Sequence, residues 1–153
     1  MSAYFFDSSA IVKRYVKETG TEWIIKLTDP AKQNRIYIAN ITGVEVISAI
    51  TRRVLNGDIS ERVWFLAKKQ FFSDFESQYR VLEITSTLIN KAMILAIVHP
   101  LRGYDAVQLA ATLVINEHRL LLSLPALTLV SADKALNKAA ISEGLTVDDP
   151  NAH

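Results

Sequence analysis

Short apolar runs alternate with longer helix-like segments along the whole chain, and this alternation is the feature that most constrains the fold. The apolar runs have strand-like composition and occupy residues 3–6, 35–39, 80–84, 127–130 and 144–147. Helices are expected between them, at residues 8–16, 21–29, 42–55, 60–78, 85–98, 103–117 and 133–143. Short strands that alternate with helices predict a three-layer α/β/α domain, with a parallel sheet between two layers of helices.

The composition supports one such domain over residues 1–153. Half of the residues are hydrophobic and 22% are charged, which is typical of a globular chain. The chain has no cysteine, so disulfides and thiolate metal sites are excluded. The N-terminal residues show no signal-peptide pattern, and the apolar stretch 88–98 is too short to cross a membrane. We therefore expect a soluble cytoplasmic protein with no membrane partner.

Four acidic residues are positioned to meet at one edge of the predicted sheet. Asp7 directly follows the first apolar run, and Asp133 lies shortly after the fourth. Glu45 and Asp105 are expected in the first turns of the helices 42–55 and 103–117. In parallel sheets ligands bind beyond the carboxyl ends of the strands, which is where these acids are expected to lie. The sequence therefore predicts a cluster of carboxylates.

Helical spacing allows a finer expectation for the segment 103–117. Asp105 should share one face of this helix with Leu109 and Thr112. The opposite, core-facing side should carry Val107, Ala110 and Val114.

Each acid also has a purely structural interpretation. Thr42 and Glu45 have the spacing of a capping box, and Asp7, Asp105 and Asp133 stand where a carboxylate caps a helix or favours its dipole. Capping alone, however, does not require convergence on one edge, and clustered carboxylates repel one another unless a cation joins them. Since the donors are all hard oxygens, Mg²⁺ or Mn²⁺ is the expected cation.

Four segments of the chain together resemble the motifs of the PIN-domain nucleases, in the same order along the sequence. They are residues 7–15 (DSSAIVKRY), 45–49 (EVISA), 103–111 (GYDAVQLAA) and 131–136 (SADKAL). The closing segment 143–150 (EGLTVDDP) is also similar to the usual end of this family. The chain is most similar to the VapC toxins of bacterial and archaeal toxin–antitoxin pairs. One departure is the leucine-rich segment 117–126, which is long for its place before the fourth motif.

The resemblance implies a PIN-like fold, one or two divalent metals in an acidic pocket, and endonucleolytic cleavage of RNA. It identifies Asp7, Glu45, Asp105 and Asp133 as the acidic quartet, catalytic and metal-binding. It also implies that the hydroxyls of Ser8 and Ser131 support these acids by hydrogen bonds, although both serines could equally be helix caps. A small antitoxin protein and a homodimer are the implied protein partners.

Substrate and partner contacts are predicted less specifically. The net charge is only +1, so RNA must be bound by a local basic patch or through recruited cations. Lys13, Arg14 and Arg102 are the candidate contacts, because they lie close in sequence to the acids. In the helix 60–78 the apolar arc is wider than one core-facing stripe requires, and Phe65 and Phe72 lie off the main stripe. We expect these two aromatics to contact an antitoxin or a second protomer, unless the helix is buried on two sides.

Four other interpretations stand beside this one, and the sequence argues against two of them. The chain could be a housekeeping PIN nuclease or a PIN-like fold that only binds. A flavodoxin-like signalling domain is disfavoured, because the run 80–84 ends at Thr85 and Ser86 with no acid. A phosphohydrolase with an aspartyl nucleophile would have a second aspartate two residues after Asp7, where the chain has Ser9.

Overall fold

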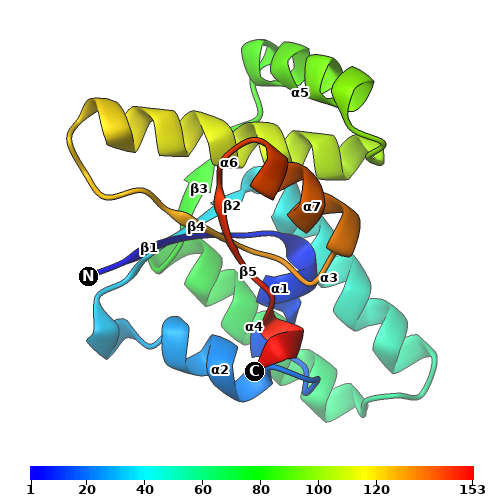
Figure 1. Ribbon diagram of the computed structural model, residues 1–153. Coiled ribbons are helices and arrows are strands. Elements are labelled where there is room, and N and C mark those ends of the chain that lie inside the picture. The colour runs from blue at the N-terminus through cyan, green and yellow to red at the C-terminus, as the bar shows by residue number, and fades with distance from the viewer.

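A computed structural model describes the whole chain, residues 1–153 (Figure 1). The strands are β1 (Ala3–Phe6), β2 (Arg35–Ala39), β3 (Arg80–Leu82), β4 (Thr128–Val130) and β5 (Thr146–Asp148). The α-helices are α1 (Ser8–Ile11), α2 (Thr21–Leu27), α3 (Asn40–Leu55), α4 (Glu61–Ser77), α5 (Ser86–Val98), α6 (Gly103–Leu121) and α7 (Lys134–Ser142). Three 3₁₀ turns complete the chain: η1 (Val12–Arg14), η2 (Pro30–Lys32) and η3 (Pro150–Ala152).

The five strands form one parallel sheet in the order β3-β2-β1-β4-β5. From β1 the chain first moves outward to β2 and β3, and then returns to place β4 on the other side of β1. The strand order therefore reverses between β1 and β4, and open α/β sheets bind ligands at the carboxyl end of such a switch point.

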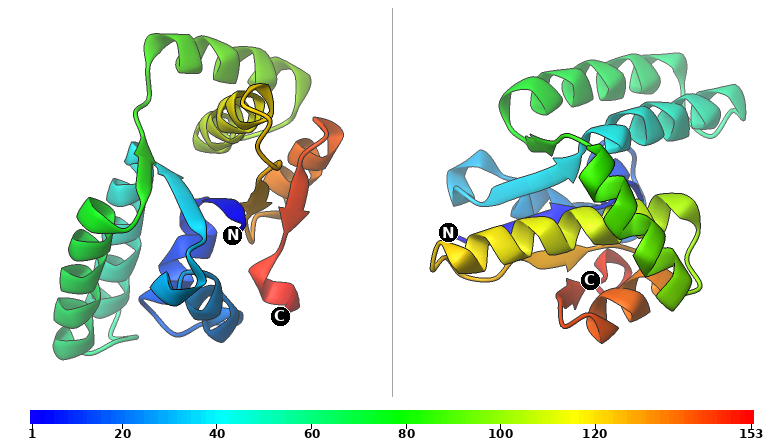
Figure 2. Two further views of the ribbon diagram at one scale, coloured as in Figure 1. Left: turned by 90° about the vertical axis from the view of Figure 1, so that its left-hand side faces the viewer. Right: turned by 90° about the horizontal axis from the view of Figure 1, so that it is seen from above.

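Alternate side chains of the strands face two separate cores. Phe5 and Leu129 pack on one face of the sheet, together with residues of α5, α6 and α7. Phe6 and Val130 pack on the other face, together with residues of α1, α2, α3 and α4. Figure 1 shows α5 and α6 above the sheet and α2 and α4 below it, and the side view in Figure 2 shows the same layers. The predicted three-layer α/β/α architecture is confirmed.

Several helices begin at the polar residues that precede them in sequence. The side chains of Asp7, Ser60, Thr85 and Asp133 each accept a hydrogen bond from the backbone N–H three residues later. Each bond satisfies one of the N–H groups that the first helical turn leaves without a partner. None of the helices combines the length and the apolar composition that a membrane crossing requires.

Several predicted helix boundaries are wrong, and one of them concerns Glu45. The helix expected over 8–16 stops at Ile11 and continues as the 3₁₀ turn η1. The helix expected from Thr42 begins at Asn40, directly after β2, so that Glu45 lies in its second turn. Thr42 is therefore not a cap. It is fully buried and accepts a hydrogen bond from Gln108 of α6, so the capping-box interpretation of Glu45 fails.

The predicted faces of α6 are also wrong. Leu109 and Thr112, which were expected beside Asp105 on the face away from the core, are completely buried. The helix lies between the sheet and α5, so it is covered on two sides and a single core-facing stripe does not describe it (Figure 1). The helix also runs to Leu121, so the first half of the leucine-rich segment 117–126 is helical.

Candidate active site

The switch point of the sheet brings the first and the last acidic motif together. Asp7 follows β1, and Ser131 follows the neighbouring strand β4. The Ser131 hydroxyl donates to Asp7 Oδ2 (2.7 Å) and accepts a hydrogen bond from the backbone N–H of Asp133 (3.0 Å). One buried serine thus links two acids that lie more than a hundred residues apart in sequence.

Asp7 is a buried carboxylate with three hydrogen-bond donors. Its Oδ1 accepts from the Ser9 hydroxyl (2.7 Å) and from the N–H of Ala10 (3.0 Å), and its Oδ2 accepts from Ser131. Only 3% of the residue is exposed. Burial raises the pKa of Asp7 to about 6, because the lost hydration of the ionised form outweighs these three bonds. The charge of Asp105 raises this pKa further.

Glu45 reaches the same region from α3 and is held at both carboxylate oxygens. Its Oε2 accepts from the Ser8 hydroxyl (3.1 Å), and its Oε1 accepts from Gln108 Nε2 (3.2 Å). The same amide nitrogen of Gln108 also donates to Thr42 (2.9 Å). Ser8 directly follows Asp7 in sequence, so these bonds place Glu45 beside the switch point.

Asp105 and Asp133 complete the group. Asp105 lies in the first turn of α6 and is half-buried, whereas Asp133 caps α7 through the N–H of Leu136 (2.8 Å). Burial raises the pKa of Asp105, and the charges of Asp133 and Glu45 raise it further, while the Arg102 guanidinium opposes the shift. The four acids thus act on one another electrostatically from four different elements.

Positive charge is scarce within the cluster. None of the four carboxylates forms an ion pair with a lysine, arginine or histidine. No three aspartate, glutamate, cysteine or histidine side chains in the protein stand close enough together to hold one metal ion. The structure thus presents neighbouring acids that form no ion pair with a basic side chain, but not a closed coordination shell.

A pocket of about 420 Å³ opens beside Glu45 and Ser8. Its walls include Tyr104, which is 60% exposed, and Arg52 from the last turn of α3. An aromatic ring and a guanidinium beside a group of acids suit a nucleotide, whose base stacks on the ring and whose phosphate attracts the cation.

The structure separates the three basic residues that were predicted to contact RNA. Lys13 is buried and pairs with Glu18 (2.9 Å), and Arg14 pairs with Asp74 (3.5 Å). Both cations are therefore engaged inside the protein, which argues against a phosphate contact for either. Arg102 is exposed at the start of α6, and it is the one candidate of the three that stays accessible.

Three residues of this region were not predicted from the sequence. Ser9 donates to Asp7 and accepts from the N–H of Ala132, Gln108 holds Glu45, and Tyr104 lines the neighbouring pocket. Gln108 stands one helical turn after Asp105, which is the spacing that could have indicated it. Nothing in the local sequence distinguishes Ser9 from an ordinary helix-forming serine.

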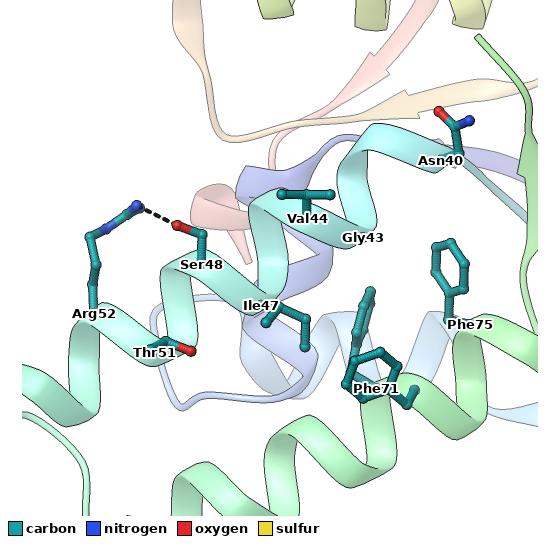
Figure 3. A pocket seen from close by; sticks show the side chains of 10 residues that line it. Asn40, Gly43, Val44, Ile47, Ser48, Thr51, Arg52, Phe71 and Phe75 are labelled. Carbon is teal, nitrogen blue, oxygen red and sulfur yellow. Dashed lines mark hydrogen bonds between the residues drawn. The ribbon is translucent and has the colours of Figure 1, made fainter.

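A second, apolar groove of about 560 Å³ runs between α3 and α4 (Figure 3). Figure 3 shows Val44 and Ile47 of α3 on one side and Phe71 and Phe75 of α4 on the other. Phe72, which was predicted to contact a partner, also lines this groove and is 53% exposed. Phe65 is equally exposed but lies outside the groove.

Comparisons with known proteins agree with this architecture. The sequence matches none of the family models with which it was compared. It is 31% identical over 147 residues to Ribonuclease VapC45 of Mycobacterium tuberculosis, which covers 96% of this chain and 95% of the relative. The structure is similar to that of PAE2754 from Pyrobaculum aerophilum, with a TM-score of 0.65 and 19% identity over 99% of this chain and 91% of the other.

A toxin–antitoxin complex from Klebsiella pneumoniae contains a similar fold, with a TM-score of 0.54 and 15% identity over 85% of this chain and 86% of that chain. These structural similarities concern the fold, whereas the similarity to VapC45 extends over nearly the whole sequence. Together with the order of the four acidic motifs, this places the chain in the VapC family of ribonucleases.

Proposed function

We propose that the protein is a metal-dependent endoribonuclease that hydrolyses RNA phosphodiester bonds, and that it is the toxin of a toxin–antitoxin pair. The observation that carries this proposal is that Asp7, Glu45, Asp105 and Asp133 come from four elements near the switch point of the sheet, influence one another electrostatically and form no ion pair. The name of the relative VapC45 supports RNA as the substrate.

The chemistry of the donors fits Mg²⁺ or Mn²⁺. All four groups are hard oxygen donors, and burial raises the pKa values of Asp7 and Asp105, with neighbouring carboxylates adding to each shift. Mg²⁺ commonly binds proteins through one or two carboxylates and keeps several waters or substrate phosphate oxygens. A closed shell of three protein ligands is therefore not required. When bound, such a cation offsets the charge of the phosphodiester and activates the attacking water.

The surrounding contacts suggest a role for each residue. We assign Asp7 and Asp105 as direct ligands, and Glu45 and Asp133 as ligands or as bases that orient water. Ser131 holds Asp7 in place, and Ser8 and Gln108 hold the two oxygens of Glu45. Arg102 and Arg52 can attract the RNA backbone, and Tyr104 offers a ring on which a base can stack.

The groove between α3 and α4 is the proposed site of the antitoxin. Its apolar lining suits the apolar face of an amphipathic helix, and Arg52 at one end suits an acidic residue of that helix. The groove shares Val44, Ser48 and Arg52 with the pocket beside Glu45, so a bound segment would lie next to the active site. The expected homodimer stays a prediction.

Cleavage of a synthetic RNA by the purified protein tests the enzymatic proposal. Activity should require Mg²⁺ or Mn²⁺, disappear with EDTA, and be lost in Asp7→Asn and Asp105→Asn, which keep the side-chain shape but remove the charge of a ligand. Growth arrest on expression, relieved by the gene product of a neighbouring small reading frame, would separate a toxin from a housekeeping nuclease. Metal-independent cleavage, or full activity of both variants, would contradict the proposed mechanism.

A further inference from the structure

A basic pocket lies at the far end of α6 from the acidic cluster. It has a volume of about 310 Å³ and is lined by Tyr37 of β2, Arg80 of β3, and His118 and Arg119 of α6, with aliphatic side chains of β3 and α6 between them. Asp105 and Arg119 are separated by 14 helical residues, or about 21 Å along the helix axis. Figures 1 and 2 show this end of α6 on the same side of the molecule as the chain's N-terminus, away from the carboxyl ends of the strands.

Arg119 is the unusual member of this pocket. Only 6% of the residue is exposed. Its Nε donates to the backbone carbonyl of Pro125 (3.0 Å), but its Nη1 is buried and has no hydrogen-bond partner. No carboxylate lies within ion-pair distance of its guanidinium. Buried guanidinium groups are normally paired with an anion, because leaving them unpaired is costly.

The protein itself supplies no anion to this pocket. None of the lining residues is acidic, and the adjacent Glu117 pairs with Lys91 of α5 (2.9 Å). The carbonyl end of α6 favours a nearby positive charge through the helix dipole. That field does not supply a hydrogen-bond acceptor for Nη1, so the protein leaves the positive charge of Arg119 without an anion.

We propose that this pocket binds the terminal phosphate of a small molecule, either free phosphate or a nucleoside monophosphate. Two guanidinium groups carry two positive charges, which match a phosphate monoester of charge near −2 better than a carboxylate or an internal phosphodiester. Guanidinium N–H groups bind phosphate oxygens in pairs, and the Tyr37 hydroxyl and the His118 ring add further possible donors. The aliphatic walls can cover the uncharged part of a nucleotide. This proposal does not depend on the proposed ribonuclease activity.

Calorimetric titration of the full-length protein with inorganic phosphate and with adenosine 5′-monophosphate tests the proposal. EDTA is present throughout, so that no cation can join phosphate to the distant acids. Arg80→Gln should weaken the binding of both ligands at least about tenfold, because it removes a charge-assisted hydrogen bond. Arg62→Gln is the matched control, since it removes the same charge from an exposed position on α4 outside the pocket, and it should leave the affinity unchanged.

The role of Arg119 is tested by Arg119→Lys, which keeps the charge but loses the planar fork, and which should also weaken both ligands. If Arg119→Lys does not fold, the proposal is tested by Arg80→Gln and His118→Gln, which should weaken the binding of both ligands. Both positions are exposed, so these substitutions should not disturb the fold. Weakening for the nucleotide alone would assign the site to a nucleotide phosphate and not to free phosphate. Equal affinities in wild type and Arg80→Gln, or binding no stronger than that of acetate at the same ionic strength, would overturn the proposal.

Discussion

Asp7 combines a structural and a chemical role in one side chain. It caps α1 through the N–H of Ala10, as an ordinary N-cap aspartate would, and it is also the most deeply buried of the four acids. Capping alone does not explain the burial, since Asp29 caps η2 equally well from an exposed position. The comparison of these two aspartates therefore isolates the effect of burial on a capping carboxylate.

We expect Asp7→Asn to raise the stability of the metal-free protein. The folded pKa of about 6 lies above the ordinary 3.8, so folding disfavours the ionised form and wild-type stability falls as the pH rises from 3.8 to 6. Asparagine caps helices as well as aspartate and carries no charge. The gain should approach about 3 kcal/mol at pH 7 and vanish below about pH 4, as measured by urea unfolding in EDTA.

Asp29→Asn is the control for this measurement, and it should show no comparable gain at any pH. A loss of stability in Asp7→Asn at pH 7 would mean that the carboxylate is needed for the fold itself.

Ser131 is the second residue whose removal should be informative. Its hydroxyl donates to Asp7 and accepts from the N–H of Asp133, so Ser131→Ala loosens two of the proposed ligands at once. Groups that orient metal ligands typically contribute 10- to 100-fold to activity or metal affinity, and we expect a loss of about that size. The readout is the rate of RNA cleavage as a function of Mn²⁺ concentration. Ser77→Ala, at an exposed serine of α4, should leave the curve unchanged.

At the scale of secondary structure, three of the four phenylalanines of α4 lie in different environments. Phe71 is buried in the core and only borders the α3–α4 groove, Phe72 is half-exposed in that groove, and Phe65 is half-exposed outside it. The same residue type on one helix thus occupies the core, the proposed antitoxin groove and the surface outside that groove. The wide apolar arc of this helix reflects one face that is buried and a second that lines the groove.

The antitoxin proposal can be tested with these positions. Phe72→Ala should weaken binding of an antitoxin segment at least about tenfold, while the stability of the isolated protein changes by less than about 1 kcal/mol. Phe65→Ala is the control with matched exposure and should affect neither. Phe71→Ala should instead lower stability by about 3–5 kcal/mol. Fluorescence anisotropy and thermal unfolding measure the two effects, and equal binding by all three variants would remove the groove from consideration.

At the scale of the whole molecule, the proposed metal site depends on the complete fold. Its acids come from the ends of β1 and β4 and from α3 and α6, which belong to helical layers on opposite faces of the sheet. A cation that joins them therefore ties the two layers together and binds the folded chain only. Such a ligand stabilises a protein in proportion to the logarithm of its concentration above the Kd.

Mn²⁺ should accordingly raise the melting temperature of the wild-type protein in a concentration-dependent way. The expected stabilisation is about 2.7 kcal/mol when the free ion is at a hundred times its Kd. The shift should be strongly reduced in Asp7→Asn and Asp105→Asn, and Asp29→Asn should behave as wild type. Differential scanning calorimetry measures all four proteins, and equal shifts in every variant would place the bound ion elsewhere.

The sequence by itself determined the class of fold and the neighbourhood of the acids. Short strands that alternate with helices allow few arrangements other than a parallel sheet with helices on both faces, and strand ends can be located from their turn and cap residues. Asp7 and Asp133 could be placed at one edge because each directly follows, or nearly follows, a strand. These are local properties, which neighbouring residues along the chain are sufficient to specify.

The tertiary structure alone decided how each of those side chains is surrounded. The burial of Asp7, the pairing of Lys13 with Glu18, the contact of Gln108 with Glu45 and the unpaired guanidinium of Arg119 all depend on residues from other elements. The hydrophobic periodicity of α6 could not show that the helix is covered on two sides, since such a pattern identifies only one buried face. Burial and pairing are set by contacts between segments distant in sequence, and they in turn set the pKa values and the charge available for binding.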